Sequence, residues 1–164
     1  MRKTMFVLGG LVCATWLSAQ DYQKTAYGIK AAAGGVDVEV QFFTPSVVRV
    51  VKSPQGEHFE KKSLAVVASP GEVGVKVGIK DGAIVMDTKV LQVNLDTSTG
   101  AFSYRTADGK FLLAEKPVEK PFVPFDHAGD ATYNVYQAFK LDADEAIYGL
   151  GQLQNGKMSQ RGVR

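Results

Sequence analysis

The sequence predicts an all-β fold, an antiparallel β-sandwich that occupies most of the 164 residues. Apolar and polar residues alternate at a period of two in several short runs, the pattern of strands with one buried face. Turn sequences rich in glycine, proline and aspartate separate these runs at intervals of about 8–12 residues, as is typical of antiparallel sandwiches. Only the N-terminus and the short alanine run 31–33 favour a helix.

The clearest strand is the run 36–42, in which three valines and a phenylalanine alternate with polar residues. Further strand-like runs follow at 47–51, 64–67, 75–79, 91–95, 102–104, 111–113 and 133–141. Turn sequences lie between them at 54–56, 70–71, 81–82, 97–100 and 108–109. Asp108-Gly109 is the clearest hairpin signal, because a type I′ turn needs a positive φ at both of its central residues.

A proline-rich stretch interrupts this pattern at 117–124 and continues into the polar run 126–130. Proline cannot donate a hydrogen bond to a sheet ladder, so a loop or an edge passage is expected. We interpret the stretch as a long connector between two sheets. The alternative is an exposed aromatic loop that touches a partner domain or a sugar.

The N-terminus has the pattern of a secretory signal peptide. Arg2 and Lys3 precede an uncharged apolar run at 5–17, and small residues at 18–20 suit cleavage after Ala19 or Gln20. The run is shorter than the roughly 20 residues that a spanning helix needs, so no membrane span is expected after signal removal. We therefore expect residues 1–20 to be a signal peptide, residues 21–164 to be one domain, and the protein to be periplasmic or extracellular. The alternative is a buried N-terminal helix.

The charge balance argues against nucleic acid as a partner. The chain has 19 basic and 17 acidic residues, and the two basic residues Arg2 and Lys3 would leave with the signal. A neutral domain offers no basic field for nucleic acid or acidic membranes. Cys13, the only cysteine, would leave as well, so the domain is expected to have no disulfide.

A phosphate-binding loop is suggested at 151–158, where two glycines and a lysine have the P-loop spacing. Met158 stands where that loop carries the hydroxyl that binds Mg²⁺, and the surrounding strands are antiparallel rather than part of a parallel βαβ unit. We therefore expect no nucleotide and no other cofactor.

The sequence also singles out no metal-binding or catalytic residue. His58 and His127 are the only histidines, and a closed zinc site needs four ligands. The acidic run 142–145 is interpreted as a polar turn, since the apolar Ile147 follows where a calcium loop would supply oxygens. There is no Gly-x-Ser-x-Gly elbow, and no pair of carboxylates stands out for glycoside hydrolysis.

The most informative segment is 145–151, Glu-Ala-Ile-Tyr-Gly-Leu-Gly, which resembles a segment of the glycoside hydrolase family 31 enzymes, the α-glucosidases and α-xylosidases. Residues 27–28 and 48–50 resemble the opening strands of the same family more weakly. In that family the Tyr-Gly-Leu-Gly strand closes a galactose-mutarotase-like N-terminal β-sandwich and leads toward a catalytic (β/α)8 barrel. The resemblance implies a sandwich of that type, with the catalytic aspartates on a barrel that the 164 residues do not include.

By this resemblance the chain would be the non-catalytic N-terminal domain of an exported α-glycosidase. Its expected partners are its own catalytic barrel and, through the whole enzyme, an α-linked oligosaccharide. Gln154, Asn155 and Arg161 would line the outer rim of the substrate pocket, because amides are good donors and acceptors for sugar hydroxyls. Alternatively, they would only hold the sandwich against the barrel. Gln152 departs from the family, in which many members carry glutamate there.

A stand-alone exported carbohydrate-binding or structural sandwich is the competing hypothesis. The only tryptophan, Trp16, would leave with the signal, and Tyr104, Phe111 and Tyr133 lie in strand patterns where core packing is their expected role. The two hypotheses differ at the surface. A domain that depends on a barrel should expose an apolar patch where its partner would sit, whereas an independent module should not.

Overall fold

The computed structural model describes residues 22–57, 63–149, 151 and 155–162. The predicted signal peptide and Gln154 lie outside them. All of the regular secondary structure in the described part is β, which confirms the predicted fold class. None of its segments is a helix long and apolar enough to cross a membrane.

Among the described residues, eleven strands form two antiparallel meanders and a separate hairpin. The first sheet contains Tyr22–Lys24 (β1), Gly28–Ala33 (β2), Val36–Thr44 (β3) and Val47–Pro54 (β4). The second contains Lys76–Lys80 (β5), Ala83–Asp87 (β6), Leu91–Asp96 (β7), Phe102–Thr106 (β8) and Phe111–Ala114 (β9). The hairpin pairs Phe122–His127 (β10) with Asp130–Val135 (β11). In each sheet the strands lie in the order in which they occur along the chain.

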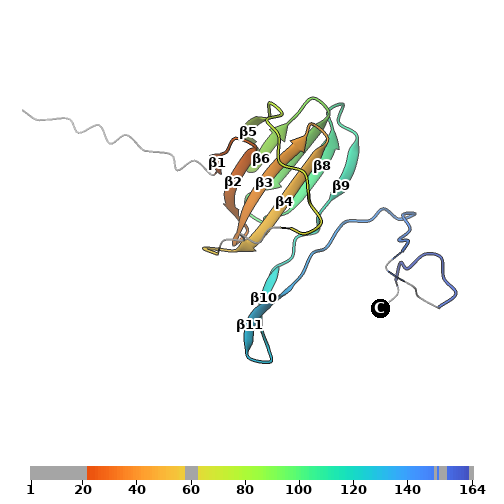
Figure 1. Ribbon diagram of the computed structural model, residues 1–164. Helices are drawn as coiled ribbons and strands as arrows, with labels where there is room; N and C mark the ends of the chain where they lie inside the picture. The colour runs from red at the N-terminus through yellow and green to blue at the C-terminus, as the bar shows by residue number, and fades with distance from the viewer. Residues whose placement is uncertain (1–21, 58–62, 150, 152–154, 163–164) are drawn as a thin grey trace, which may run out of the picture.

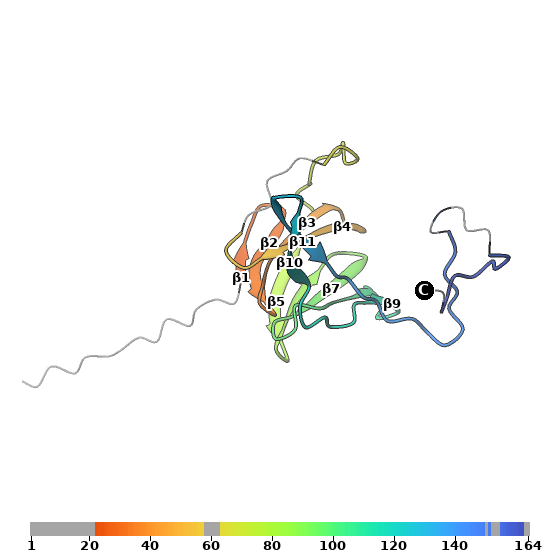
Figure 2. The same cartoon turned by 90° about the horizontal axis from the view of Figure 1, so that it is seen from below.

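The two sheets face one another and enclose the core, while the hairpin projects from one end of the sandwich (Figures 1 and 2). Alternation produces this core directly, because every second residue of a strand points to the same face. The largest fully buried side chains come from both sheets: Phe42, Phe102, Ile29, Ile84, Met86, Leu95, Val40 and Val93. The sandwich therefore rests on apolar packing between the two inner faces.

One turn prediction differs from the structure, and another is confirmed. Asp108 does not have a positive φ, whereas Gly109 does, and the strands join through the four-residue loop 107–110, so the predicted type I′ turn is wrong there. Asp81 and Gly82, by contrast, have φ values of 50° and 76° and connect the directly paired Lys80 and Ala83. That is a two-residue hairpin with positive φ at both central positions.

Two strand predictions and one helix interpretation also need correction. The run 64–67 is exposed and forms no strand, because the Ser63 hydroxyl accepts hydrogen bonds from the Ala65 and Val66 amides at 3.3 Å and so offers them a local alternative to a ladder. The alanine run 31–33 is part of β2 rather than a helix, since pairing with β3 overrides alanine's helix propensity. The late strand 133–141 is shorter than expected, as β11 ends at Val135.

The proline-rich stretch is a connector only as far as residue 121. From Phe122 onward it is strand β10, so the prediction of a connector is wrong for this part. Pro124 lies opposite Tyr133 in a ladder of only two strands. A proline is tolerated there because each strand of a two-stranded hairpin is an edge strand. The polar run that follows forms the hairpin's tip.

Candidate functional site

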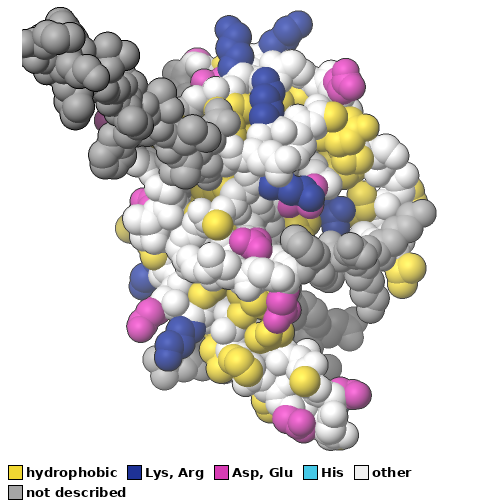
Figure 3. Space-filling view, turned by 90° about the vertical axis from the view of Figure 1, so that its left-hand side faces the viewer, with side chains coloured by type: hydrophobic (Ala, Val, Ile, Leu, Met, Phe, Trp, Pro, Cys, Tyr) yellow, Lys and Arg dark blue, Asp and Glu magenta, His cyan; other side chains and the backbone are white. Residues whose placement is uncertain are grey.

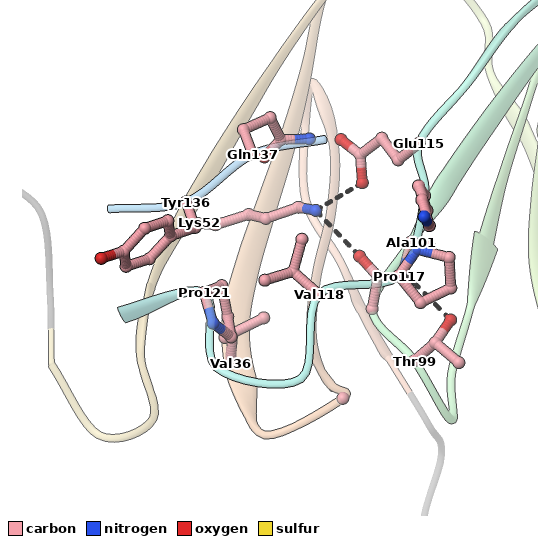
Figure 4. Close-up of a pocket in the computed structure, with 13 residues that line it drawn as sticks. Val36, Lys52, Thr99, Ala101, Glu115, Pro117, Val118, Pro121, Tyr136 and Gln137 are labelled. Atoms are coloured by element: carbon pink, nitrogen blue, oxygen red, sulfur yellow. Dashed lines mark hydrogen bonds and ion pairs between the residues drawn. The ribbon is translucent and has the colours of Figure 1, made fainter. Parts of the chain in front are cut away.

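A buried ion pair between Lys52 and Glu115 lies at the end of the sandwich from which the hairpin departs (Figure 4). Lys52 lies on β4 and Glu115 directly follows β9, and Lys52 Nζ donates to Glu115 Oε2 at 2.6 Å. The side chains are only 16% and 8% exposed. Lys52 Nζ also donates to the Gly100 carbonyl at 2.9 Å, and the Phe102 amide donates to the same Glu115 oxygen at 3.0 Å. One buried pair thus joins both sheets.

The hairpin is anchored beside this pair by backbone contacts. Glu115 forms an isolated antiparallel bridge with Phe139. The Lys116 amide donates to the Ala138 carbonyl at 2.9 Å, and the Lys140 amide donates to the Ala114 carbonyl at 2.8 Å. The chain that leaves the five-stranded sheet at Glu115 therefore returns to the same place after the hairpin.

A mainly apolar hollow of about 580 Å³ lies between the sandwich and the base of the hairpin. Lys52 and Glu115 contribute its polar part, and Tyr104 lies in it with a pKa raised by burial and, secondarily, by the charge of Glu115. We call this region the apolar hollow. Its other lining residues are Val50, Leu113, Pro121, Phe122, Val135, Tyr136, Gln137 and Phe139.

Several apolar side chains of the hollow are left open to solvent. Val135, Tyr136 and Phe139 are each about half exposed or more, and Leu113 is also exposed. In the face shown in Figure 3, hydrophobic side chains also appear at the surface of the projecting hairpin, beside the acidic side chains of its tip. The exposed apolar cluster therefore lies next to a two-stranded hairpin, which is only marginally stable by itself.

Gln154 lies outside the described residues, while Asn155 and Arg161 lie in the C-terminal segment, whose described parts 141–149, 151 and 155–162 bond mainly to one another (Figure 1). The Asn155 amide donates to Gln160 Oε1 at 2.9 Å, and Asn155 Oδ1 accepts from the Lys157 amide at 3.0 Å. Arg161 Nη1 donates to the carbonyls of Asp142 and Glu145 at 2.5 and 2.6 Å. Asn155 and Arg161 are both exposed, and their contacts fix the shape of this segment.

The described residues contain no group of three or more histidine, cysteine, aspartate or glutamate side chains that could hold a metal. His127 is exposed at the tip of the hairpin, and His58 lies outside the described residues. The acidic run 142–145 is a turn, in which the Glu145 amide donates to the Asp142 carbonyl at 3.2 Å.

Our sequence analysis missed the Lys52–Glu115 pair, although one signal was present. Lys52 continues the inward row of β4 after Val48 and Val50, and it lies opposite the buried Val38 of β3. A lysine at an inward position needs a buried partner. Alternation alone could not identify Glu115 as that partner, because it lies 63 residues away along the chain.

Comparisons with known proteins agree with this architecture. The family model for the glycosyl hydrolase 31 N-terminal galactose mutarotase-like domain matches residues 37–164. An α-xylosidase of Saccharolobus solfataricus is 29% identical over 124 residues, which are 75% of this chain and 16% of that protein. The chain thus spans about a sixth of the length of that curated relative.

Solved structures show the same relationship. The family 31 α-xylosidase of Xanthomonas citri matches with a TM-score of 0.75 and 29% identity over 84% of this chain and 15% of that one. A soil-metagenome α-xylosidase in complex with xylose has a TM-score of 0.64 and 18% identity, covering 87% and 24% of the two chains. A Flavobacterium johnsoniae dextranase in complex with glucose has a TM-score of 0.61 and 21% identity, covering 87% and 17%.

The last two identities support the fold alone, whereas the family model matches well over half of the chain. Its match and the two-sheet architecture agree with the resemblance of the Tyr-Gly-Leu-Gly segment. The chain belongs to glycoside hydrolase family 31, of which it forms the N-terminal galactose mutarotase-like domain.

Proposed function

We propose that this domain serves an exported enzyme that hydrolyses α-glycosidic bonds in carbohydrate metabolism, with an α-xyloside as its favoured substrate class. The two relatives at 29% identity are both α-xylosidases, which supports xylose over glucose. The domain itself is non-catalytic. It packs on the enzyme's barrel and helps to shape the substrate entrance.

The observation that carries this proposal is the apolar hollow with its exposed lining. Leu113, Val135, Tyr136 and Phe139 come from two separate parts of the chain and converge on one surface. A self-sufficient module would bury such residues, because covering apolar surface contributes about 25 cal/mol per Å². We therefore assign the hollow as the surface on which the barrel packs.

Dye binding by the purified chain tests this assignment. The wild type should enhance the fluorescence of anilinonaphthalene sulfonate, and the double variant Val135→Ser/Phe139→Ser should lose most of that enhancement. Val47→Ser/Ile79→Ser is the matched control, since these two residues are 51% exposed but lie on other strands. A monomeric chain that binds no dye would instead favour the stand-alone carbohydrate-binding or structural module.

Activity and export have their own tests. The purified chain should release no sugar from an aryl α-xyloside or α-glucoside above background, and release would contradict a non-catalytic role. If residues 1–20 are a signal peptide, mass spectrometry of the exported protein should show an N-terminus at Gln20 or Asp21. A retained Met1 would contradict cleavage.

The rim role of Gln154, Asn155 and Arg161 stays part of the proposal. Asn155→Ala in the whole enzyme should raise the KM for a xyloside with kcat nearly unchanged, as expected for loss of a contact that substrate and transition state share. A purely structural role would instead lower the stability of the enzyme and leave the KM unchanged.

A further inference from the structure

The outer edge of β9 is only partly occupied. β9 is the last strand of its sheet. Residues 138–140 begin a sixth strand along it, through a bridge between Glu115 and Phe139 and the two backbone hydrogen bonds that flank this bridge. The chain then turns away. Phe111, Leu112 and Leu113 remain at the edge with exposed side chains. An open edge with exposed apolar residues is a site at which another strand tends to add.

The existing register specifies which residues would continue that strand. Ala114 is bonded to Lys140, and Glu115 is paired with Phe139. Continuing the antiparallel register places Leu141 opposite Leu113 and Asp142 opposite Leu112. Leu113 and Leu141 are 36% and 40% exposed and would become cross-strand neighbours on the face that carries Phe139.

Leu112 is the residue of β9 at which this pairing would continue. Leu112 is the extra residue of a bulge, because Tyr104 pairs with Leu113 and Arg105 pairs with Phe111. It therefore has no opposite residue on β8. The bonds of Ala114 and Lys116 to the returning segment make Leu112 the next position from which an outward hydrogen-bonded pair would form.

Side chains of the C-terminal segment occupy the backbone groups that Leu112 would need. The Asp142 carbonyl accepts from Arg161 Nη1 at 2.5 Å, and the Asp142 amide donates to Glu145 Oε2 at 3.1 Å. The Asp142 amide has a single hydrogen, so it can bond the β9 edge or Glu145 and not both, while the bond from Arg161 holds the Asp142 carbonyl in the turn. Arg161 also bonds the Glu145 carbonyl, so one guanidinium holds the turn 142–145 closed.

We propose that the edge of β9 is a strand-addition site for the chain's own residues 141–143, and that Arg161 holds this segment off the edge. Release of Arg161 lets Leu141 close over Leu113, extends the five-stranded sheet and covers part of the apolar hollow. The inference concerns this domain alone and does not depend on the proposed substrate or on the barrel.

Disulfide trapping in the full chain tests the register. Cys13 is the only cysteine, so Cys13→Ser gives a background free of thiols. Leu113→Cys/Leu141→Cys then places two thiols at a non-hydrogen-bonded pair, where the geometry suits a disulfide. Oxidised glutathione is the oxidant, and one disulfide forms as it is reduced. Leu112→Cys/Leu141→Cys is the control with the register shifted by one residue.

The in-register pair should cross-link within one chain and should do so at least about tenfold faster with Arg161→Gln, because that change removes a charged donor from Asp142. Lys157→Gln is the matched charge control, since the Lys157 side chain makes no hydrogen bond or ion pair among the described residues. Circular dichroism of each variant checks that it is folded.

Three results would overturn the proposal. Equal rates for the in-register and shifted pairs, or no cross-link at all, would rule out this strand addition. Cross-links only between two chains would make a second copy the occupant of the edge. A rate that Arg161→Gln leaves unchanged, relative to Lys157→Gln, would remove Arg161 as the restraint.

Discussion

Replacing Glu115 by alanine should destabilise the domain far more than removing a surface charge. One oxygen of Glu115 accepts from Lys52 Nζ at 2.6 Å and from the Phe102 amide at 3.0 Å, and both bonds are lost together. Truncating one partner of a buried ion pair costs about 3–5 kcal/mol. In the variant, Lys52 would keep its hydrogen bond to the Gly100 carbonyl and its partial exposure to solvent. We therefore expect a loss of unfolding free energy at the lower end of this range, about 3 kcal/mol.

Glu115→Gln separates the two contributions. The glutamine oxygen can still accept from the Phe102 amide, while the charge opposite Lys52 is gone. We expect a cost of about 2 kcal/mol, the range for a hydrogen bond to a charged group. Lys52→Met combined with Glu115→Gln should cost less than the sum of the single changes, with a coupling of about 1–3 kcal/mol.

Urea unfolding followed by circular dichroism measures these differences. At a slope of about 2 kcal/mol per molar urea, a loss of 3 kcal/mol lowers the midpoint by about 1.5 M. Lys30→Ala is the control, because its pair with Glu39 spans 3.9 Å and its side chain is 54% exposed. Such a pair contributes less than about 1 kcal/mol. If Glu115→Ala shifts the midpoint no more than Lys30→Ala does, the buried pair does not hold the sheets together.

Two further predictions concern the turns beside this pair. Gly34→Ala should destabilise the domain by roughly 3 kcal/mol or more, and Gly35→Ala by about 1–2 kcal/mol. Both glycines have a positive φ. A Cβ on Gly34 would lie 2.3 Å from the Thr99 backbone, whereas a Cβ on Gly35 would meet open space. Equal unfolding midpoints for the two variants would contradict the close approach. Hydrogen bonds from the Ser98 hydroxyl and the Thr99 amide lower the pKa of Asp96. Because that pKa is depressed in the folded state, its stabilisation is present above the unfolded value of about 3.9 and is lost as the pH falls through the folded value. Wild type should therefore be more stable than Asp96→Asn at pH 6, with the difference shrinking below about pH 4, and a constant difference would contradict this.

Alternation allowed most of the sandwich to be predicted from sequence. The runs 36–42 and 91–95 each have apolar side chains on one face, and the structure buries these side chains in the core. Local chemistry misled the prediction at 64–67, where the Ser63 hydroxyl competes with a ladder, and at 122–127, where proline concealed an edge strand. In each case the deciding interaction was absent from the apolar pattern.

The candidate site was harder to predict than the fold, because its parts are far apart along the chain. The hollow joins β4, β8 and β9 to residues 121–139, and no local pattern predicts which segments meet. The rim residues were selected by resemblance to a family. Among them, the structure shows Asn155 and Arg161 bonded to the C-terminal segment itself, so contacts with a substrate would need part of that network to rearrange.

Glu115 divides the chain into parts that differ in how they are stabilised. Every fully buried apolar side chain in the described residues lies at or before Ala114, while most of the apolar side chains after it are exposed. Local stability follows buried contacts, so the hairpin and the C-terminal segment should open at a much lower free energy than the sandwich does. The Lys52–Glu115 pair lies at this boundary and connects the two sheets beside it. A body that covers the hollow would therefore order the hairpin without altering the sandwich that carries it.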